Sequence, residues 1–271
     1  MRKVLVIGGG AAGMMAAVTA AKNGGQVLLL EKNEKLGKKL FITGKGRCNI
    51  TNAAEIEEFF SAVVSNPKFL YSSFYSFTND QVIDFFEKLG VQTKVERGGR
   101  VFPASDHSSD VIRALEREMG RLGVKIRLRT EVKELIVEDG TVKGALLSSG
   151  KKLYADAVII TTGGVSYPST GSTGDGYRFA RECGHKVTEL LPSLVPMEVK
   201  EWYAKELMGL SLRNIEILIT DGKKKLYREF GEMMFTHYGV TGPVILSASS
   251  LVGKRLKGKE LPLHIDLNPA R

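Results

Sequence analysis

Three glycines near the N-terminus, Gly8, Gly10 and Gly13, have the GxGxxG spacing that is typical of diphosphate binding. Gly8 permits a tight turn, Gly10 lets the backbone approach phosphates closely, and Gly13 lets a helix pack against a strand. Ala12 lies between the last two glycines, where that helix begins. The free N–H groups and positive dipole end of such a helix attract phosphate oxygens. The spacing therefore predicts a dinucleotide-binding turn, with a merely glycine-rich turn as the alternative.

The elements on either side of these glycines fit the same interpretation. Residues 4–7 are an apolar run typical of a strand buried on both faces, and residues 11–22 follow as a helix. A second strand over residues 26–30 ends at Glu31, eighteen residues after Gly13. A carboxylate at this position accepts hydrogen bonds from ribose hydroxyls and repels a 2′-phosphate, which disfavours NADP. NAD and the ADP half of FAD both remain open on this motif.

A basic, glycine-rich segment over residues 32–51 is expected to be irregular and to lie, at residues 35–49, over the far half of the cofactor. Converging amides and positive side chains suit a flavin, because the reduced ring develops negative charge near N1 and O2. A mobile surface loop is the alternative. For Cys48 a small buried residue beside the ring is favoured over a redox thiol, because no CxxC partner is present. The candidate cofactor-binding residues of this region are Lys32, Lys38, Lys39, Gly46, Arg47, Cys48 and Asn49.

A second glycine cluster follows another buried strand, expected at residues 157–161. Its glycines are expected to pass close to the ADP portion at the carboxyl edge of the sheet, and a purely structural loop is the alternative. Val132 begins a predicted β-meander over residues 132–154, at a point where a backbone group often faces the adenine in two-domain flavoproteins. The candidate residues of the second cluster are Thr162, Gly163, Gly164, Gly174 and Asp175.

The remaining polar residues point to no other chemistry. The four histidines have no metal-ligand spacing with one another or with the two cysteines, so no metal site is expected. The sequence contains no Ser-His-Asp arrangement and no nucleophile elbow. His237 is a candidate proton donor or substrate ligand, although a hydrogen-bonded structural histidine is the favoured interpretation. No catalytic residue is assigned.

The composition is typical of a soluble globular protein with more than one domain. The chain has 271 residues, of which 43% are hydrophobic and 25% are charged, enough for a large core without disulfides. The presence of only two cysteines predicts a cytoplasmic protein. The first strand begins close to the N-terminus, so no signal peptide is expected, and no apolar run is long enough to predict a membrane span. The net charge of +9 is scattered and is interpreted as a solvated surface, with anionic substrates or RNA as alternatives.

The element pattern changes along the chain and predicts an α/β fold in two parts. A Rossmann-like nucleotide-binding domain with a β-meander is expected over residues 1–190, and an incomplete β-rich domain over residues 191–271. The second part is expected to be all-β, with residues 241–251 ambiguous between strand and helix.

These motifs together resemble a bacterial family of FAD-binding flavoproteins. Its members are described as aminoacetone oxidase-like or 3-dehydro-bile-acid reductase-like NAD(P)/FAD-dependent oxidoreductases. The resemblance covers the whole chain, and the segments that carry it are GGGAAG from Gly8, KKLFITGKGRCNITN from Lys38, GRVFP around Arg100, TTGGVSYPSTGSTGDGY from Thr161 and GEMMFTHYGVTGP from Gly231.

The resemblance implies a Rossmann-like FAD-binding domain followed by part of a β-barrel-like insert domain, with FAD held by the candidate residues. It implies flavin-mediated hydride transfer to a small-molecule substrate, with NAD(P)H as a transient reductant. Such proteins close with a glycine-rich segment that this chain lacks, so a fragment is expected, with the remainder on another chain as the alternative. A flavin-dependent RNA-modifying protein and a non-catalytic nucleotide-binding fragment are the alternatives. Nucleic-acid and membrane partners are disfavoured, and no oligomeric state is assigned.

Overall fold

The computed structural model describes residues 1–256 and 259–269. The chain divides into two units, Met1–Val187 and Thr188–Arg271, and each has its own hydrophobic core. The sequence predicts the corresponding domain boundary after residue 190. Within the part of the chain that the structure describes, every helix is too short or too polar to traverse a lipid bilayer.

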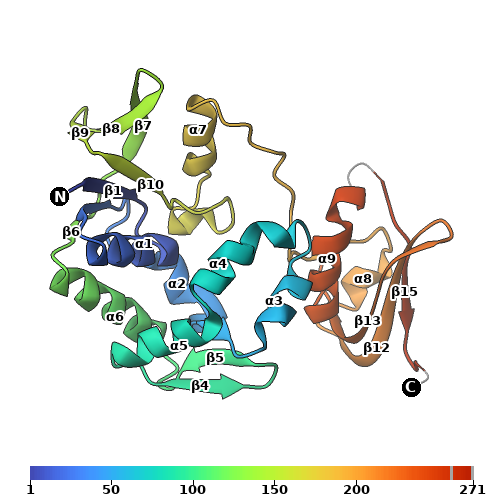
Figure 1. Ribbon diagram of the computed structural model, residues 1–271. Helices are drawn as coiled ribbons and strands as arrows, with labels where there is room; N and C mark the ends of the chain where they lie inside the picture. Colours follow the sequence, from blue (N-terminus) through green and yellow to red (C-terminus); the bar gives the residue numbers. More distant parts are fainter. Residues whose placement is uncertain (257–258, 270–271) are drawn as a thin grey trace. The chain divides into compact units, whose positions relative to one another are not determined.

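The first unit is built on a four-stranded parallel sheet with the strand order β10-β1-β2-β6. Figure 1 labels three of these strands, β1, β6 and β10. Its strands and the helices of this unit are β1 (Lys3–Ile7), α1 (Ala11–Lys22), β2 (Gln26–Leu30), α2 (Lys38–Ile42), α3 (Ile56–Ala62), α4 (Tyr71–Ser76), α5 (Asn79–Lys88), α6 (Ser108–Arg121), β6 (Lys125–Arg127), β10 (Ala157–Ile160) and α7 (Asp175–Glu182). Short 3₁₀ turns are η2 (Pro67–Leu70) and η3 (Pro168–Thr170). The turn η1 (Thr43–Gly46) contains left-handed backbone angles at Gly44 and Lys45.

Two small antiparallel sheets complete this unit. One has the order β3-β5-β4 and contains β3 (Thr51–Asn52), β4 (Thr93–Glu96) and β5 (Arg100–Pro103). The other is the β-meander, with β7 (Val132–Glu138), β8 (Thr141–Leu147) and β9 (Lys152–Tyr154) in sequential order.

Each face of the parallel sheet is buried against a different layer, because side chains alternate along a strand. Val6 and Leu29 belong to a core cluster with residues of α1 and α6. Leu5, Ile7 and Leu30 belong to a second cluster with residues of the meander and of α7. Burial on both faces is what a parallel sheet requires, so the predicted α/β fold class is confirmed.

The strand order reverses at β1, since β2 pairs with one of its edges and β10 with the other. Loops leaving the carboxyl ends of β1 and β10 diverge from such a point, and the crevice between them is where nucleotides bind in sheets of this kind. The predicted glycine motifs at residues 8–13 and 161–176 begin in these two loops and extend into the first turns of α1 and α7.

The second unit contains an antiparallel sheet with the order β11-β14-β13-β12-β15. Its elements are β11 (Met197–Glu198), α8 (Tyr203–Glu206), β12 (Ser211–Asp221), β13 (Lys224–Phe235), β14 (Gly239–Thr241), α9 (Pro243–Leu256) and β15 (Leu263–Asp266). The structure differs here from the predicted all-β organisation. Helix α9 occupies the ambiguous segment because Pro243 suits a first helical position and Val244, Ala248 and Val252 recur at helical spacing in the core.

Tyr227 lies in the core of the second unit, and its buried hydroxyl has no hydrogen-bond partner among the described residues. A buried polar group without a partner lowers stability. Tyr227→Phe is therefore expected to raise the free energy of unfolding by about 1 kcal/mol. Urea denaturation of the variant tests this, with Tyr203→Phe, at an exposed position, as the control that changes little. A clear loss of stability in Tyr227→Phe would contradict the expectation.

Glu118 of α6 is 5% exposed and pairs with Lys22 of α1 and with Arg121. Hydrogen bonds from Arg121 are the main cause that lowers the pKa of Glu118 from 4.5 to about 2, and burial opposes them. A lowered pKa in the folded state gives stability that is present above pH 4.5 and is lost as the pH falls toward 2.

We therefore expect Glu118→Gln to lower the free energy of unfolding by about 2 kcal/mol at pH 7, allowing for solvent screening of the exposed Arg121. The difference from the parent protein should shrink toward pH 2. Denaturant titrations across this range measure the effect, and Glu116→Gln, at an exposed position of the same helix, is the matched control. A pH-independent difference would show that the carboxylate charge is not responsible.

Candidate functional site

A hollow of about 350 Å³ opens at the carboxyl edge of the parallel sheet. Its walls come from the turn after β1, the end of β2, helix α2, the start of β7 and the segment between β10 and α7. All of these elements belong to the first unit. The volume lies within the range of small-molecule sites, and the position is the reversal point of the sheet.

The glycine motif shapes one wall of the hollow. Gly8 has a φ of 105°, and a Cβ there would lie 2.5 Å from the carbonyl oxygen of Thr161. A Cβ at Gly13 would overlap the carbonyl oxygen of Gly8. Gly10 differs, because its φ of −79° is ordinary and a Cβ there would meet no described atom within 4 Å. The space next to the Gly10 Cα is therefore not filled by any described atom of the chain.

Helix α1 begins next to this space with an uncapped N-terminus. Gly10 is its N-cap, no side chain of the described residues caps it, and its first turn has no acidic residue. Gly10 and Ala12 both line the hollow. Unsatisfied N–H groups and the positive dipole end of a helix attract anions, so a diphosphate suits this wall.

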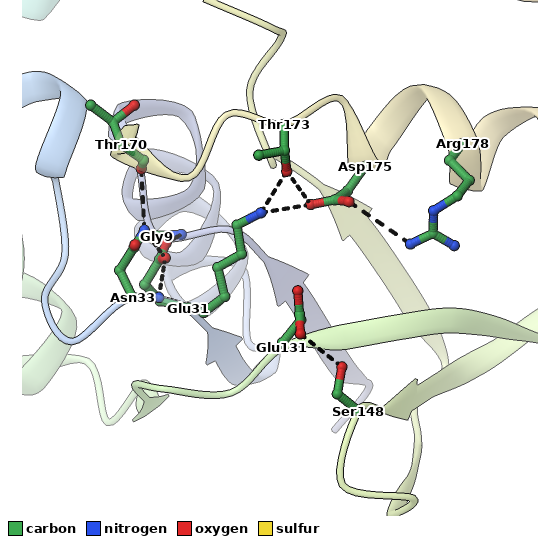
Figure 2. A network of polar contacts seen from close by, with 10 residues as sticks. Gly9, Glu31, Asn33, Glu131, Ser148, Thr170, Thr173, Asp175 and Arg178 are labelled. Atoms are coloured by element: carbon green, nitrogen blue, oxygen red, sulfur yellow. Dashed lines mark hydrogen bonds and ion pairs between the residues drawn. The ribbon is translucent and has the colours of Figure 1, made fainter. Parts of the chain in front are cut away.

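Glu31 is 7% exposed at the end of β2, and three hydrogen bonds fix its carboxylate (Figure 2). One oxygen accepts from the backbone N–H of Gly9 at 2.6 Å. The other accepts from the backbone N–H and the side-chain amide of Asn33, both at 2.7 Å. A carboxylate oxygen has room for more than one donor, so the oxygen bonded to Gly9 can accept a ribose hydroxyl as well.

Lys32 and Asp175 form an ion pair in the lining of the hollow. The Lys32 Nζ lies 2.8 Å from an Asp175 carboxylate oxygen and 2.7 Å from the Thr173 hydroxyl. The Arg178 guanidinium lies 3.9 Å from the other carboxylate oxygen of Asp175 (Figure 2). Burial alone would raise the pKa of Asp175, but the hydrogen bonds from Lys32 and Thr173 outweigh it and the pKa is lowered. Asp175 therefore stays ionised at neutral pH and keeps Lys32 at the wall.

Further hydrogen bonds tie the segment before α7 to residues after β2. The amide of Asn33 donates to the carbonyl oxygen of Thr170 at 3.1 Å, and the Lys39 Nζ donates to that of Ser166 at 2.7 Å. Next to this segment, Thr162 lines the hollow and its buried hydroxyl has no partner among the described residues. A Cβ at Gly176 would lie 2.8 Å from this hydroxyl, so the hydroxyl lies against the first turn of α7.

Most of the predicted cofactor-binding residues meet at this hollow. Those that line it are Gly8, Gly10, Ala12, Glu31, Lys32, Lys38, Lys39, Val132, Thr162, Gly163 and Asp175. Those outside its lining are Gly13, Gly46, Arg47, Cys48, Asn49, Gly164 and Gly174.

Cys48 lies in the core of the first unit, with 3% of its surface exposed. Burial is the main cause that raises the pKa of its thiol, and a protonated thiol is a poor nucleophile.

His237 lies in the second unit between β13 and β14, with its ring edge against Tyr238. Across the described residues, no group of three or more His, Cys, Asp and Glu side chains is arranged to hold a metal ion.

Several lining residues could not be identified from the sequence. Asn33 follows Glu31 by two positions, but only the folded chain shows that its amide and backbone hold the carboxylate. The others that line the hollow without having been predicted include Gly9, Leu40, Thr43, Thr130, Glu131, Thr161, Ser172 and Phe179. Phe179 is a fully buried aromatic on α7 and carried no signal other than helical periodicity.

The fold and this site place the chain in a known class. The chain belongs to the family described as the HI0933-like protein Rossmann domain, whose model matches residues 2–257. The predicted resemblance to FAD-binding flavoproteins is thereby confirmed.

Two curated relatives extend the comparison. The chain is 35% identical over 246 residues to the 3-dehydro-bile acid delta(4,6)-reductase of Clostridium scindens, covering 90% of this chain and 58% of that protein. It is 32% identical over 226 residues to the ribosomal RNA dihydrouridine synthase of Escherichia coli, covering 83% of this chain and 54% of that protein. The chain therefore spans little more than half the length of these relatives.

Among solved structures, the open conformation of a flavocytochrome c3 fumarate reductase matches with a TM-score of 0.58 and 21% identity. The match covers 79% of this chain and 47% of that chain, and it shows a shared fold.

Proposed function

We propose that this protein is an FAD-dependent oxidoreductase whose hollow holds the cofactor. The observation that carries the proposal is the open space at Gly10, beside the uncapped N-terminus of α1 and in the same hollow as the carboxylate of Glu31. A diphosphate and an adjoining ribose need these two features side by side. Family membership supports FAD as the dinucleotide.

The residues present fit the parts of FAD. Glu31 would accept a ribose hydroxyl, the amides after Gly10 would bind the diphosphate, and Val132 would lie beside the adenine. Lys38 and Lys39 supply positive charge at the remaining wall. Bound FAD supplies hydride transfer, whereas the chain binds the cofactor, orients it and excludes water.

The reaction that we propose is reduction of a carbon–carbon double bond next to a carbonyl group in a small molecule. The names of both curated relatives denote the addition of hydrogen, one to a bile acid and one to uridine in ribosomal RNA. A hydride and a proton would saturate the bond, and NAD(P)H would return the two electrons. The GxGxxG fingerprint occurs once, at Gly8–Gly13, so NAD(P)H would bind transiently rather than at a second site of this kind. Such an enzyme would work in the cytoplasm.

RNA modification is a second candidate because one relative at 32% identity acts on ribosomal RNA and the net charge is +9. This candidate predicts binding to ribosomal RNA fragments that weakens steeply with salt. Filter binding at low and high salt separates the two candidates, since a small-molecule reductase has no need for such affinity.

Anaerobic reduction tests the proposed activity. The FAD-loaded protein is mixed with NADH and, separately, with NADPH, and loss of the oxidised flavin absorbance is followed. Bleaching by either nicotinamide, with reoxidation by an α,β-unsaturated ketone, supports the proposal. A bound flavin that neither nicotinamide reduces would instead support a non-catalytic nucleotide-binding module.

A further inference from the structure

Arg47 makes its main contacts away from the hollow, on the hairpin formed by β4 and β5. Its two terminal nitrogens each lie 2.9 Å from a different carboxylate oxygen of Glu96, a bidentate pair. Its guanidinium lies 4.0 Å from the ring centre of Phe102. Charge-assisted bidentate hydrogen bonds and stacking on an aromatic face are the strongest contacts available to an arginine. Two contacts therefore fix the guanidinium of Arg47: the bidentate pair with Glu96 and the cation–π contact with Phe102.

Two further residues close a ring of alternating charges around this contact. Asp106 lies 3.3 Å from Arg47 and 2.5 Å from Lys94, and Lys94 lies 3.8 Å from Glu96. Hydrogen bonding from Arg47 is the main cause that lowers the pKa of Glu96, and hydrogen bonding from Lys94 does the same for Asp106. Both carboxylates thus remain ionised at neutral pH, and the ring persists there.

The backbone that carries Arg47 has an unusual conformation. Gly44, Lys45, Gly46 and Cys48 have φ values of 57°, 59°, 85° and 61°, whereas Arg47 itself has a φ of −94°. The left-handed region is disfavoured for non-glycine residues such as Lys45 and Cys48. A segment of this kind keeps its conformation only where its surroundings fix it, and the side chain of Arg47 supplies such a contact.

The same segment is bonded to the wall of the hollow. Thr43 and Leu40 line the hollow, and the Thr43 hydroxyl donates to the carbonyl oxygen of Leu40 at 2.7 Å. The backbone N–H of Cys48 donates to the carbonyl oxygen of Thr43 at 3.1 Å. The residue next to Arg47 is thus bonded directly to a residue of the wall.

We infer that Arg47 is a positioning residue that anchors residues 43–48 on the β4–β5 hairpin and thereby holds the wall formed by α2 and Thr43. The inference rests on the proposed binding of FAD. Glu31 and Gly10 account for the ADP half of the cofactor, which leaves the α2–Thr43 wall for the flavin half. Arg47 therefore acts on flavin binding through Thr43 and makes no contact with the cofactor itself.

Binding of FAD and of ADP to Arg47 variants tests the inference. We expect Arg47→Ala to raise the Kd for FAD about tenfold, the loss of roughly one charge-assisted interaction, with an unchanged Kd for ADP. Arg47→Lys should recover part of the affinity. Arg228→Ala, which removes an arginine–glutamate pair of the second unit, is the matched control and should bind FAD normally. Equal losses for FAD and ADP, or no loss for FAD, would overturn the inference.

Trypsin cleavage of the FAD-free protein gives a readout that does not depend on the cofactor. Glu96→Gln keeps every tryptic site and should speed cleavage after Lys45, whereas Glu216→Gln should not. Unchanged cleavage after Lys45 would overturn the inference. If the parent protein fails to bind FAD, the proposed function fails, whereas cleavage after Lys45 still reports whether Arg47 anchors the segment.

Discussion

Gly10→Val is expected to lower the affinity for FAD by about a hundredfold or more, because the added side chain fills the space proposed for the diphosphate. The same change should cost no more than about 1 kcal/mol of stability, the typical size of a helix N-cap effect. Position 10 has an ordinary φ of −79°, and a Cβ there meets no described atom within 4 Å. Fluorescence titration with FAD and thermal unfolding measure the two effects separately.

Gly120→Val is the matched control for this prediction. Gly120 also has free space around a Cβ among the described residues, but it lies on α6 outside the hollow. This variant should bind FAD with the affinity of the parent protein. Gly13→Ala should behave differently from both, because its methyl group would overlap the carbonyl oxygen of Gly8 and unfold the turn. Normal FAD affinity in Gly10→Val would rule out a diphosphate at this position.

Glu31→Gln is expected to weaken FAD binding by at least about tenfold and to lower the free energy of unfolding by about 2 kcal/mol. The carboxylate accepts three hydrogen bonds, one from Gly9 and two from Asn33. An amide offers one oxygen in place of two, so its NH₂ group would face a donor and leave a buried N–H unpaired. Isothermal titration with FAD and urea denaturation measure the two losses.

Asp156→Asn controls for the removal of a carboxylate charge near the same sheet. Asp156 accepts a hydrogen bond from the backbone N–H of Lys3, at the amino end of β1, and lies outside the hollow. An asparagine keeps that bond through its oxygen, so FAD binding should not change. A Glu31→Gln variant that loses stability and retains full FAD affinity would assign Glu31 a purely structural role.

The elements around the hollow could be predicted because their signals are local. The glycine spacing, the apolar runs of β1 and β2 and the position of Glu31 all lie within the first 31 residues, and the structure has them at the predicted places. Helix α1 begins and ends at the predicted residues, Ala11 and Lys22. Short-range patterns of this kind need no knowledge of distant parts of the chain.

Features that depend on distant contacts could not be predicted in the same way. Arg47 follows a basic loop in sequence, but its partners Glu96 and Phe102 lie about fifty residues further along the chain. Helix α2 forms within a segment whose Gly and Lys content indicates irregular structure, because its place is set by contacts with α6. Asparagine is usually exposed, so its residue type alone gives Asn33 no role. Only in the folded turn does its side-chain amide donate a hydrogen bond to the carboxylate of Glu31.

A crystal structure of the protein with bound FAD would test the central claim most directly. We expect the diphosphate on the N–H groups that follow Gly10, a ribose hydroxyl on the carboxylate of Glu31 and the adenine beside Val132. Density for FAD outside this hollow, or a hollow that stays empty at saturating FAD, would contradict the assignment of the site and of the cofactor together.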